Sequence, residues 1–436
     1  MMHFSTNIVL VKPVLWPKTL SPYMVLGIVL GVVMPLVSAM IYPTYMHRMP
    51  SPWVEWTRLL ELPFVICEIL VIHWALRNGM NSIAIWRSLP NDIKIASVLL
   101  FVGVFVSTIL ISANPLTSIA ISLATCIHVL FALAVFHIVG QSSLDDVSAL
   151  IYGLGAGLLS LAALTAFRFG FPPLASQVPG GVIEWSSALP GFINVRHFGS
   201  WTGAVAAAFV TKLLFAGPKQ RLSWPHFFYF VSATMTVWSG TRAAIMALLV
   251  TAALLVAIRR EIPSFRAVSI VAALTGAALT TAWLLLPYDD PSFLLYRAGA
   301  GLEANEITSG RTLLWTATFS KWLESPLIGW GSGSVFWEVY AGWPHTQPHN
   351  AILQFLISWG IVGATGGLWL LGRATVAASK SAIRQPSFQP LLAILFALLI
   401  MSLVEGMLHY PRFIMLIMLL FAVILSPNRA KQEQST

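Results

Sequence analysis

The chain has little charge and little cysteine. Only 9% of its 436 residues are charged, whereas 57% are hydrophobic and the mean hydropathy is +0.80. A soluble domain of this length needs far more charged surface, so the composition excludes that class and indicates a polytopic membrane protein. The two cysteines, Cys67 and Cys126, both fall in predicted membrane spans, which favours packed thiols over a disulfide.

Aspartate is also scarce, which argues against a metal centre. Among the five aspartates, only Asp289 and Asp290 are predicted to face outward, and such a pair is more typical of a solvated turn than of a divalent-cation site. We therefore expect no metal and no other cofactor. The run GWGSGS at 329–334 is too irregular for a phosphate-binding glycine loop and follows no predicted strand. A cytoplasmic nucleotide or nucleotide-sugar ligand is not expected.

Apolar runs long enough to cross a bilayer recur along the whole chain. They predict an all-α polytopic membrane protein with about twelve transmembrane helices and no cleavable signal peptide. The predicted spans are Tyr23–Ile41, Leu59–Leu76, Ile95–Ser112, Leu116–Val139, Val147–Phe167, Phe198–Ala216, Trp224–Trp238, Arg242–Ile258, Arg266–Leu286, Asn350–Gly372, Phe388–Val404 and Arg412–Ser426.

The distribution of lysine and arginine predicts the orientation of these spans. With the N-terminus inside, 16 of the 25 basic residues are cytoplasmic, which favours an N-in, C-in topology. The net charge of +9 thus reflects mostly contacts with anionic membrane lipids and implies no nucleic-acid partner. One integral-membrane domain (1–436) is predicted, with helices 1–9 in residues 1–286, a long outward-facing loop at 287–349, helices 10–12 at 350–427 and a cytoplasmic tail at 428–436.

The basic residues predicted to lie on the outward side, against the positive-inside rule, are mostly arginines. Eight of the nine on the outward side are arginine, whose planar, permanently charged guanidinium binds phosphate oxygens through paired hydrogen bonds. They suggest an anionic ligand outside, although any one of them can be a snorkelling or ion-paired boundary residue. The candidates are Arg242 in SGTR, Arg196 in NVRHFGSW, Arg311 in SGRTLLW and Arg412 at the start of the last span. Unpaired N–H groups at a helix start, predicted beside Arg242 and Arg196, also favour phosphate.

The run PHTQPHNAILQ places His345 and His349 at the edge of the long loop, just before an apolar helix. A histidine at a membrane boundary is a candidate proton-transfer group, and Asn350 beside it is a candidate substrate contact. The alternative is that this run only starts a helix, with Asn350 as its N-cap. Whether His345, Gln347 or His409 assists His349 stays open.

Two carboxylates complete the candidate site. A carboxylate inside a membrane is costly unless it is paired. Glu61 lies near the outer end of the second predicted span and Glu405 at the outer end of the eleventh. We hypothesise that they hold or orient the outward arginines.

Two runs, GRTLLWTATFSKWLESPLIGWGSGS and HTQPHNAILQFLISWGIVG, together resemble the shared core of the bacterial O-antigen ligase and polymerase superfamily. The residues that carry the resemblance are, in order, Arg311, Trp315, Pro326, Gly329, Gly331, His349, Asn350, Gly360, Ile361 and Gly363. The SGTRAAIMAL run resembles the other arginine-bearing helix start of the family. The resemblance is sharp over residues 239–372 and only topological elsewhere.

The resemblance implies a GT-C-like glycosyltransferase in a Gram-negative inner membrane, with its active site facing the periplasm. Its donor would be a glycan linked to undecaprenyl pyrophosphate, and its acceptor, for a ligase, the lipid A-core oligosaccharide. His349 would act as general base, while Arg242, Arg311 and Arg196 would bind the departing pyrophosphate without a metal. Direct displacement would invert the anomeric configuration.

Within the superfamily, the ligase is favoured because the single long loop and the set of two arginines and one histidine resemble its pattern. This chain departs from the family's R-x-x-x-L run, because Met246 occupies the position of the leucine after Arg242. An O-antigen polymerase is the alternative. A protein O-oligosaccharyltransferase would carry a further soluble domain, which the ending PNRAKQEQST does not favour. A transporter of the same lipid-linked glycan would be expected to show inverted repeats of broken helices, and no such repeats are evident.

Overall fold

The structure is a computed structural model that describes residues 21–40, 61–140, 147–169, 191–192, 195–217, 221–285, 311–333, 339 and 347–426. Every regular element within these residues is helical, as the apolar runs predict. The α-helices are α1 (Pro22–Ile28), α4 (Leu62–Arg77), α5 (Ser82–Ser88), α6 (Asn91–Val106), α7 (Pro115–Val139), α8 (Val147–Phe169), α10 (Val195–Leu214), α11 (Trp224–Trp238), α12 (Arg242–Arg259), α13 (Phe265–Leu284), α15 (Arg311–Leu323), α16 (Ala351–Arg384), α17 (Gln389–Ser402) and α18 (Pro411–Leu425). Two π-helical stretches, η1 (Val29–Val33) and η2 (Ser107–Ile111), extend α1 and α6, and the 3₁₀ turn η6 (Pro386–Phe388) precedes α17.

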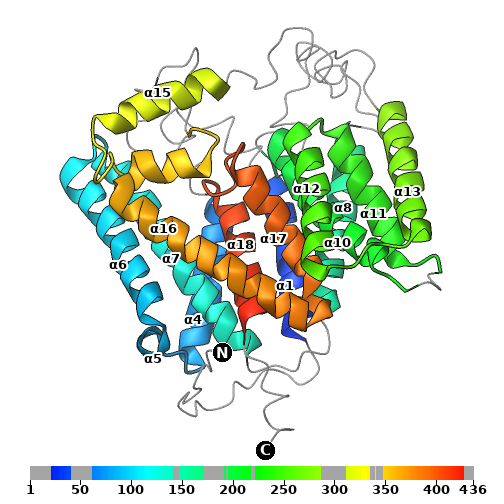
Figure 1. Cartoon of the computed structure of the whole chain (residues 1–436), viewed down its shortest axis with the longest axis horizontal. Helices are drawn as coiled ribbons and strands as arrows, with labels where there is room; N and C mark the ends of the chain where they lie inside the picture. The colour runs from blue at the N-terminus through cyan, green and yellow to red at the C-terminus, as the bar shows by residue number, and fades with distance from the viewer. Residues whose placement is uncertain are drawn as a thin grey trace, which may run out of the picture.

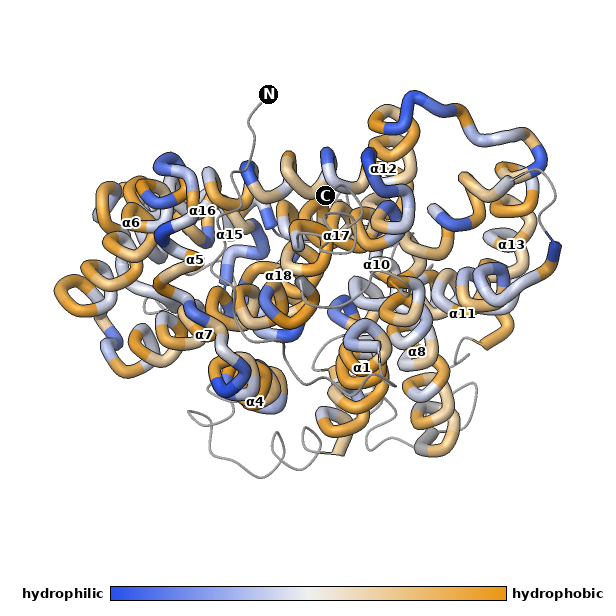
Figure 2. Tube along the Cα trace, turned by 90° about the horizontal axis from the view of Figure 1, so that it is seen from below, coloured by the Kyte–Doolittle hydropathy of each residue, from blue (hydrophilic) through white to orange (hydrophobic). Residues whose placement is uncertain are grey.

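The described helices make the chain a multi-pass membrane protein. Seven of them are long and apolar enough to cross a membrane, and an eighth span results if α4 and α5, bent by 87°, are counted as one. The apolar helices Pro386–Met401 and Pro411–Leu425 are shorter. Each of the twelve predicted spans overlaps a helix, but the count of twelve is not confirmed. Most of the helical trace is hydrophobic, and hydrophilic residues gather at connections such as that between α12 and α13 (Figure 2).

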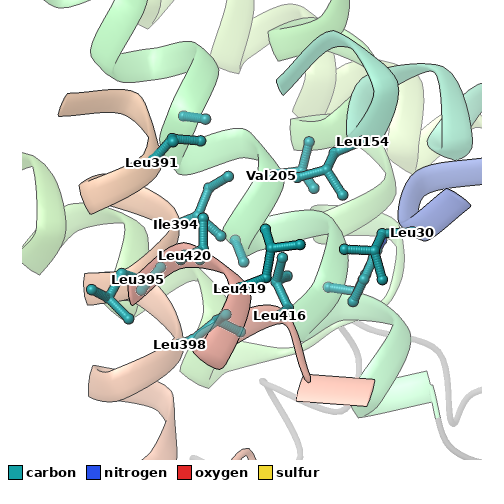
Figure 3. Close-up of a cluster of buried hydrophobic side chains, with 14 of the residues drawn as sticks. Leu30, Leu154, Val205, Leu391, Ile394, Leu395, Leu398, Leu416, Leu419 and Leu420 are labelled. Carbon is teal, nitrogen blue, oxygen red and sulfur yellow. The ribbon is translucent and has the colours of Figure 1, made fainter. Parts of the chain in front are cut away.

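The core lies where α10, α17 and α18 meet α1 and α8. Figure 3 shows Leu154, Val205, Leu391 and Leu416 from these helices converging on one cluster, and all four are fully buried. Small residues let α10 approach its neighbours closely, because the alanines in Val205–Ala208 leave the backbones free to pack. Almost all of α10 is buried, so it forms the centre of the bundle rather than its lipid face.

The segment predicted as a long outward loop contains a helix of its own. α15 occupies 13 residues of that segment and lies across one end of the bundle (Figure 1). Much of the rest of the predicted loop, namely residues 287–310, 334–338 and 340–346, lies outside the described residues.

α16 is broken near its start. Gly360 has φ 61° and ψ −171°, a backbone conformation that is essentially confined to glycine. The break separates a short helix that ends at Trp359 from a long one that begins at Ile361. Figure 1 shows the short helix turned across the end of the bundle, beneath α15, while the long one runs diagonally along it. The residue before this short helix is Asn350, so the break sets the direction of the segment that follows His349.

The turn after α15 fills the break in α16. Four backbone hydrogen bonds join them: Trp330 N–H to Ile357 O (2.8 Å), Gly331 N–H to Ser358 O (2.9 Å), Ile361 N–H to Pro326 O (2.9 Å) and Val362 N–H to Leu327 O (3.2 Å). A Cβ on Gly360 would lie 2.3 Å from Ile328 N, and one on Gly329 would lie 2.5 Å from Gly360 N. Side chains at these two positions would therefore separate the turn from the helix.

Candidate functional site

Four arginines predicted to face outward stand at the first or second residue of a helix. Arg242 opens α12, Arg311 opens α15, Arg196 is the second residue of α10 and Arg412 is the second residue of α18. A helix N-terminus carries partial positive charge, so it disfavours a cation and favours an anion. Each position therefore combines a guanidinium with backbone N–H groups that attract phosphate.

Three of these arginines interact electrostatically. Burial lowers the pKa of Arg311, the charges of Arg196 and Arg242 lower it further, and an ion pair with Glu405 opposes them. Because the charges of Arg196 and Arg242 act on Arg311, both residues lie within electrostatic range of it, and we call the three residues the cationic cluster. The structure thus relates arginines that open three different helices, α10, α12 and α15.

Glu405 connects this cluster to His349. It lies in the connection between α17 and α18, is 2% exposed, and pairs with Arg311 through one carboxylate oxygen. Its other oxygen, Oε2, lies 3.3 Å from His349 Nδ1. Burial alone would raise the pKa of Glu405, but His349 together with the charges of Arg311 and Arg196 prevails and lowers the pKa to about 2. The carboxylate is therefore ionised at neutral pH.

His349 is held in an uncommon backbone conformation. Its φ of 53° lies in the left-handed region, which histidine enters more readily than most residues. Trp315 Nε1–H donates a 2.9 Å hydrogen bond to Pro348 O, which fixes the backbone just before it. Asn350 Oδ1 caps α16 by accepting hydrogen bonds from two N–H groups of its first turn at 3.0 and 3.1 Å, and Asn350 Nδ2 donates to Leu403 O at 3.0 Å. These contacts are those of a helix N-cap, which is the role that the alternative interpretation gives to Asn350.

Two further polar residues contact the His349 segment. Gln347 Nε2 lies 3.3 Å from His349 Nδ1 and 3.5 Å from the hydroxyl of Tyr410, and Gln347 is 1% exposed. The Tyr410 ring packs against His197 with the ring centroids 4.1 Å apart. The sequence left the role of Gln347 open and gave no signal for Tyr410, because only the fold brings the α17–α18 connection to this segment. His345 lies outside the described residues.

Arg412 is enclosed, unlike the three clustered arginines. It is 2% exposed, and both its backbone N–H and its Nε–H donate to Glu61, at 2.8 and 2.7 Å. Its NH2 group donates to Gly191 O at 2.6 Å, and its guanidinium lies 4.3 Å from the centre of the Phe192 ring. A phosphate could reach this guanidinium only by displacing Glu61. We therefore leave Arg412 out of the pyrophosphate site proposed below and assign it a structural role.

A second glutamate near Glu61 in sequence, Glu68 of α4, also has a partner inside the bundle. Glu68 pairs with His128 of α7, with 2.7 Å between Glu68 Oε2 and His128 Nδ1, and both side chains are buried. The buried pair joins α4 to α7 inside the bundle. Cys67 and Cys126 are free thiols, as predicted.

These features define a class of protein: an all-helical, multi-pass membrane protein with a cationic cluster and a histidine joined by a buried carboxylate at one end of its bundle. Residues 227–366 match the sequence model of a family described as O-antigen ligase. This match covers about a third of the chain, includes Arg242, Arg311 and His349, and confirms that the chain carries the domain of the O-antigen ligase and polymerase superfamily. A comparison with curated proteins found no match.

Proposed function

We propose that the protein transfers a glycan from undecaprenyl pyrophosphate to an acceptor hydroxyl, and that it is the O-antigen ligase, whose acceptor is the lipid A-core oligosaccharide. The observation that carries the proposal is the joining of His349 and Arg311 by Glu405, beside the charges of Arg196 and Arg242. Enzymes of this superfamily act in O-antigen processing, and three of these residues lie in the matched domain. The proposed location is a Gram-negative inner membrane, with the site facing the periplasm.

The proposed reaction is a single displacement. The acceptor hydroxyl oxygen bonds to the anomeric carbon as the bond from that carbon to the pyrophosphate oxygen breaks. His349 takes the hydroxyl proton, and undecaprenyl pyrophosphate leaves with the electron pair of the broken bond. Attack opposite the leaving group inverts the anomeric configuration.

Glu405 is the residue that prepares His349 for this role. Its ionised carboxylate lies 3.3 Å from Nδ1 of His349, so it stabilises the positive charge that His349 gains when it takes the proton of the acceptor. Glu405 also holds Arg311, so a single buried carboxylate fixes both the base and one guanidinium. Glu405 is accordingly a positioning residue, and its partners are the groups that would touch substrate.

The arginines stabilise the leaving group. Negative charge grows on the pyrophosphate in the transition state, and guanidiniums fixed in advance stabilise it without reorganisation. Arg242 and Arg311 each open a helix whose N-terminal N–H groups favour the same anion. The side chain of Arg311 remains 16% exposed, which leaves it accessible to a ligand even while it contacts Glu405.

The base assignment is tested with His349→Ala. Loss of a general base lowers transfer by about 10² to 10⁴, whereas the affinity for lipid-linked donor should stay close to wild type because the arginines remain. His73→Ala, on the exposed face of α4, is the matched control and should transfer normally. Transfer by His349→Ala at near the wild-type rate would show that His349 is not the base.

The ligase assignment is tested in a strain that lacks the gene. Long polymer stranded on undecaprenyl pyrophosphate, with bare lipid A-core, identifies a ligase. Single repeats on the carrier, with at most one repeat on the core, identify a polymerase instead. Donor that accumulates on the cytoplasmic side of the membrane identifies a transporter and contradicts both enzymatic assignments.

A further inference from the structure

Three aromatic side chains follow Arg311 along one side of α15. Trp315, Phe319 and Trp322 come after it at intervals of four, four and three residues, so each lies about one helical turn beyond the last. We call these three residues the aromatic stripe. The rings of Phe319 and Trp322 are in contact, with their centroids 5.2 Å apart. Trp315 already holds the backbone before His349, but the proposed reaction gives no role to the other two rings.

The aromatic stripe is accessible from outside the bundle. Phe319 is 45% exposed, and Trp315 and Trp322 are both partly exposed. The helix that carries them lies across one end of the bundle rather than within it (Figure 1). Aromatic rings gain much free energy when they are covered, so a row of exposed rings indicates a surface that binds something.

Hydroxyl groups run beside the rings. Thr316 and Ser320 are both exposed, and each of them follows a residue of the aromatic stripe by one position. The Thr316 hydroxyl donates a 3.0 Å hydrogen bond to Thr312 O and can still accept one from a ligand. The surface therefore offers apolar faces and hydrogen-bonding groups side by side.

Between Arg311 and Lys321 this surface carries no charge. Residues 312–320 contain no acidic or basic side chain, whereas helices that lie on anionic membranes carry lysine and arginine on their polar face. Lys321 pairs with Glu324 and lies over the Trp330 ring, 4.4 Å from its centre. The charge pattern therefore favours an uncharged, hydroxyl-rich ligand over a membrane surface.

A sugar chain has this chemistry. One face of a pyranose ring presents C–H groups that pack on an aromatic ring, while its hydroxyls form hydrogen bonds at the edge. At 1.5 Å per residue, Phe319 and Trp322 lie about 12 and 17 Å beyond Arg311 along the helix, on the order of two to three sugar units. A glycan whose pyrophosphate lies at Arg311 can thus reach both rings.

We infer that the aromatic stripe is a subsite for the glycan of the donor, and that it binds sugars two to three units beyond the one attached to pyrophosphate. The inference rests on the proposed function, because it assumes a lipid-linked glycan at the cationic cluster. Stacking on C–H faces tolerates different sugars. The stripe therefore selects donors by the length of their glycan more than by the identity of its sugars.

The test measures binding of two donors to the full-length protein in nanodiscs. One is undecaprenyl pyrophosphate that carries only the first sugar, and the other carries the polymer that accumulates in a strain lacking the gene. We expect Phe319→Ala to raise the Kd for the polymer donor about fivefold, through loss of one stacked ring, and to leave the Kd for the one-sugar donor unchanged. Phe319→Trp, which keeps an aromatic ring, should bind both donors like wild type. An equal change for both donors, or no change for either, would overturn the inference.

The control variant is Leu313→Ala. Leu313 is 59% exposed on the same helix but does not belong to the aromatic stripe, so its loss should change neither Kd. If Leu313→Ala weakens polymer binding as much as Phe319→Ala does, the stripe is not the subsite. These assays need no turnover, so length-dependent binding by a protein that transfers no glycan would overturn the proposed function alone.

A photoreactive residue separates the glycan from the membrane as the ligand of the stripe. Benzoylphenylalanine in place of Phe319 should form cross-links to the glycan of the polymer donor. Cross-links to phospholipid that persist when this donor is present would mean that the stripe faces the membrane, and would overturn the inference.

Discussion

The break in α16 offers the sharpest test of how the fold positions the site. Gly360→Ala puts a Cβ 2.3 Å from Ile328 N and from the carbonyl of Leu327, all backbone atoms that cannot move independently. It also places a side chain at φ 61° and ψ −171°, where strain costs about 1–3 kcal/mol for residues other than glycine. The turn and the helix break must therefore move apart.

The size of the destabilisation by Gly360→Ala follows from the contacts between the turn and α16. Four backbone hydrogen bonds cross the contact, each worth a net of about 0.5–1.5 kcal/mol. If two of them are lost in addition to the strain, the total cost is roughly 2–6 kcal/mol. The short helix from Ala351 to Trp359 would tilt, and His349 precedes that helix. If His349 is the base, as proposed, a displacement of about 1 Å can lower turnover by about 10².

The matched control lies in the same helix. A Cβ on Gly372 meets no atom within 4 Å, so Gly372→Ala adds a methyl group in open space and should be neutral or stabilising by up to about 1 kcal/mol. Thermal unfolding in nanodiscs and single-turnover transfer are measured for both variants. We expect Gly360→Ala to unfold at lower temperature and to lose about 10² in turnover. If Gly360→Ala matches Gly372→Ala in both assays, the break does not position the site.

Two further predictions concern the buried carboxylates. The pKa of Glu405 is about 2 in the folded protein and about 4.3 in the unfolded chain. The ionised carboxylate therefore contributes about 3 kcal/mol to the free energy of unfolding above pH 4.3, and this contribution is lost as the pH falls through about 2. The Glu405→Gln variant should not show this loss of stability when unfolding is measured as a function of pH. If the variant loses as much stability in acid as the wild type, Glu405 is not the group responsible. Arg412→Ala leaves Glu61 buried without its ion-pair partner, so it should cost about 3–5 kcal/mol while the remaining folded protein keeps its donor KM. The control is Arg373→Ala, which removes an exposed ion pair with Asp92 and should change the unfolding temperature little. If Arg412→Ala instead raises the KM for donor and keeps normal stability, Arg412 belongs to the substrate site.

The sequence predicts the helices well because apolar length is a property of local composition. It could not predict the break at Gly360, since a hydropathy pattern carries no information about backbone dihedral angles. The run GIVG is equally compatible with a continuous apolar helix, and only the packing of the 325–331 turn against it requires the glycine conformation. α15 was missed for a related reason: its 13 residues are amphipathic and too short for a span, so they were interpreted as loop.

The candidate site was predictable in its residue types but not in its pairing. Arginines on the outward side were visible from the positive-inside rule, and the placement of Arg242, Arg196 and Arg412 at helix starts followed from the neighbouring apolar runs. Arg311 was expected in a loop, and only the structure shows that it opens α15. The particular partners were not predictable, because Glu405 and Arg311 are 94 residues apart and meet only through tertiary packing. The contact between Gln347 and Tyr410 likewise depends on how the α17–α18 connection folds over the start of α16.

The same local arrangement occurs twice in this bundle, with opposite consequences. At Arg412 and at Arg311, an arginine near a helix start pairs with a buried glutamate from another segment, which offsets the cost of a cation at that terminus. Arg412 and Glu61 are both enclosed, and an aromatic ring lies beside the guanidinium, so that pair fastens α18 to α4. The side chain of Arg311 is eight times more exposed, and its glutamate also faces His349. Exposure therefore distinguishes the two pairs: the enclosed pair fastens α18 to α4, whereas the open pair leaves Arg311 accessible to the proposed substrate anion while Glu405 holds it beside His349.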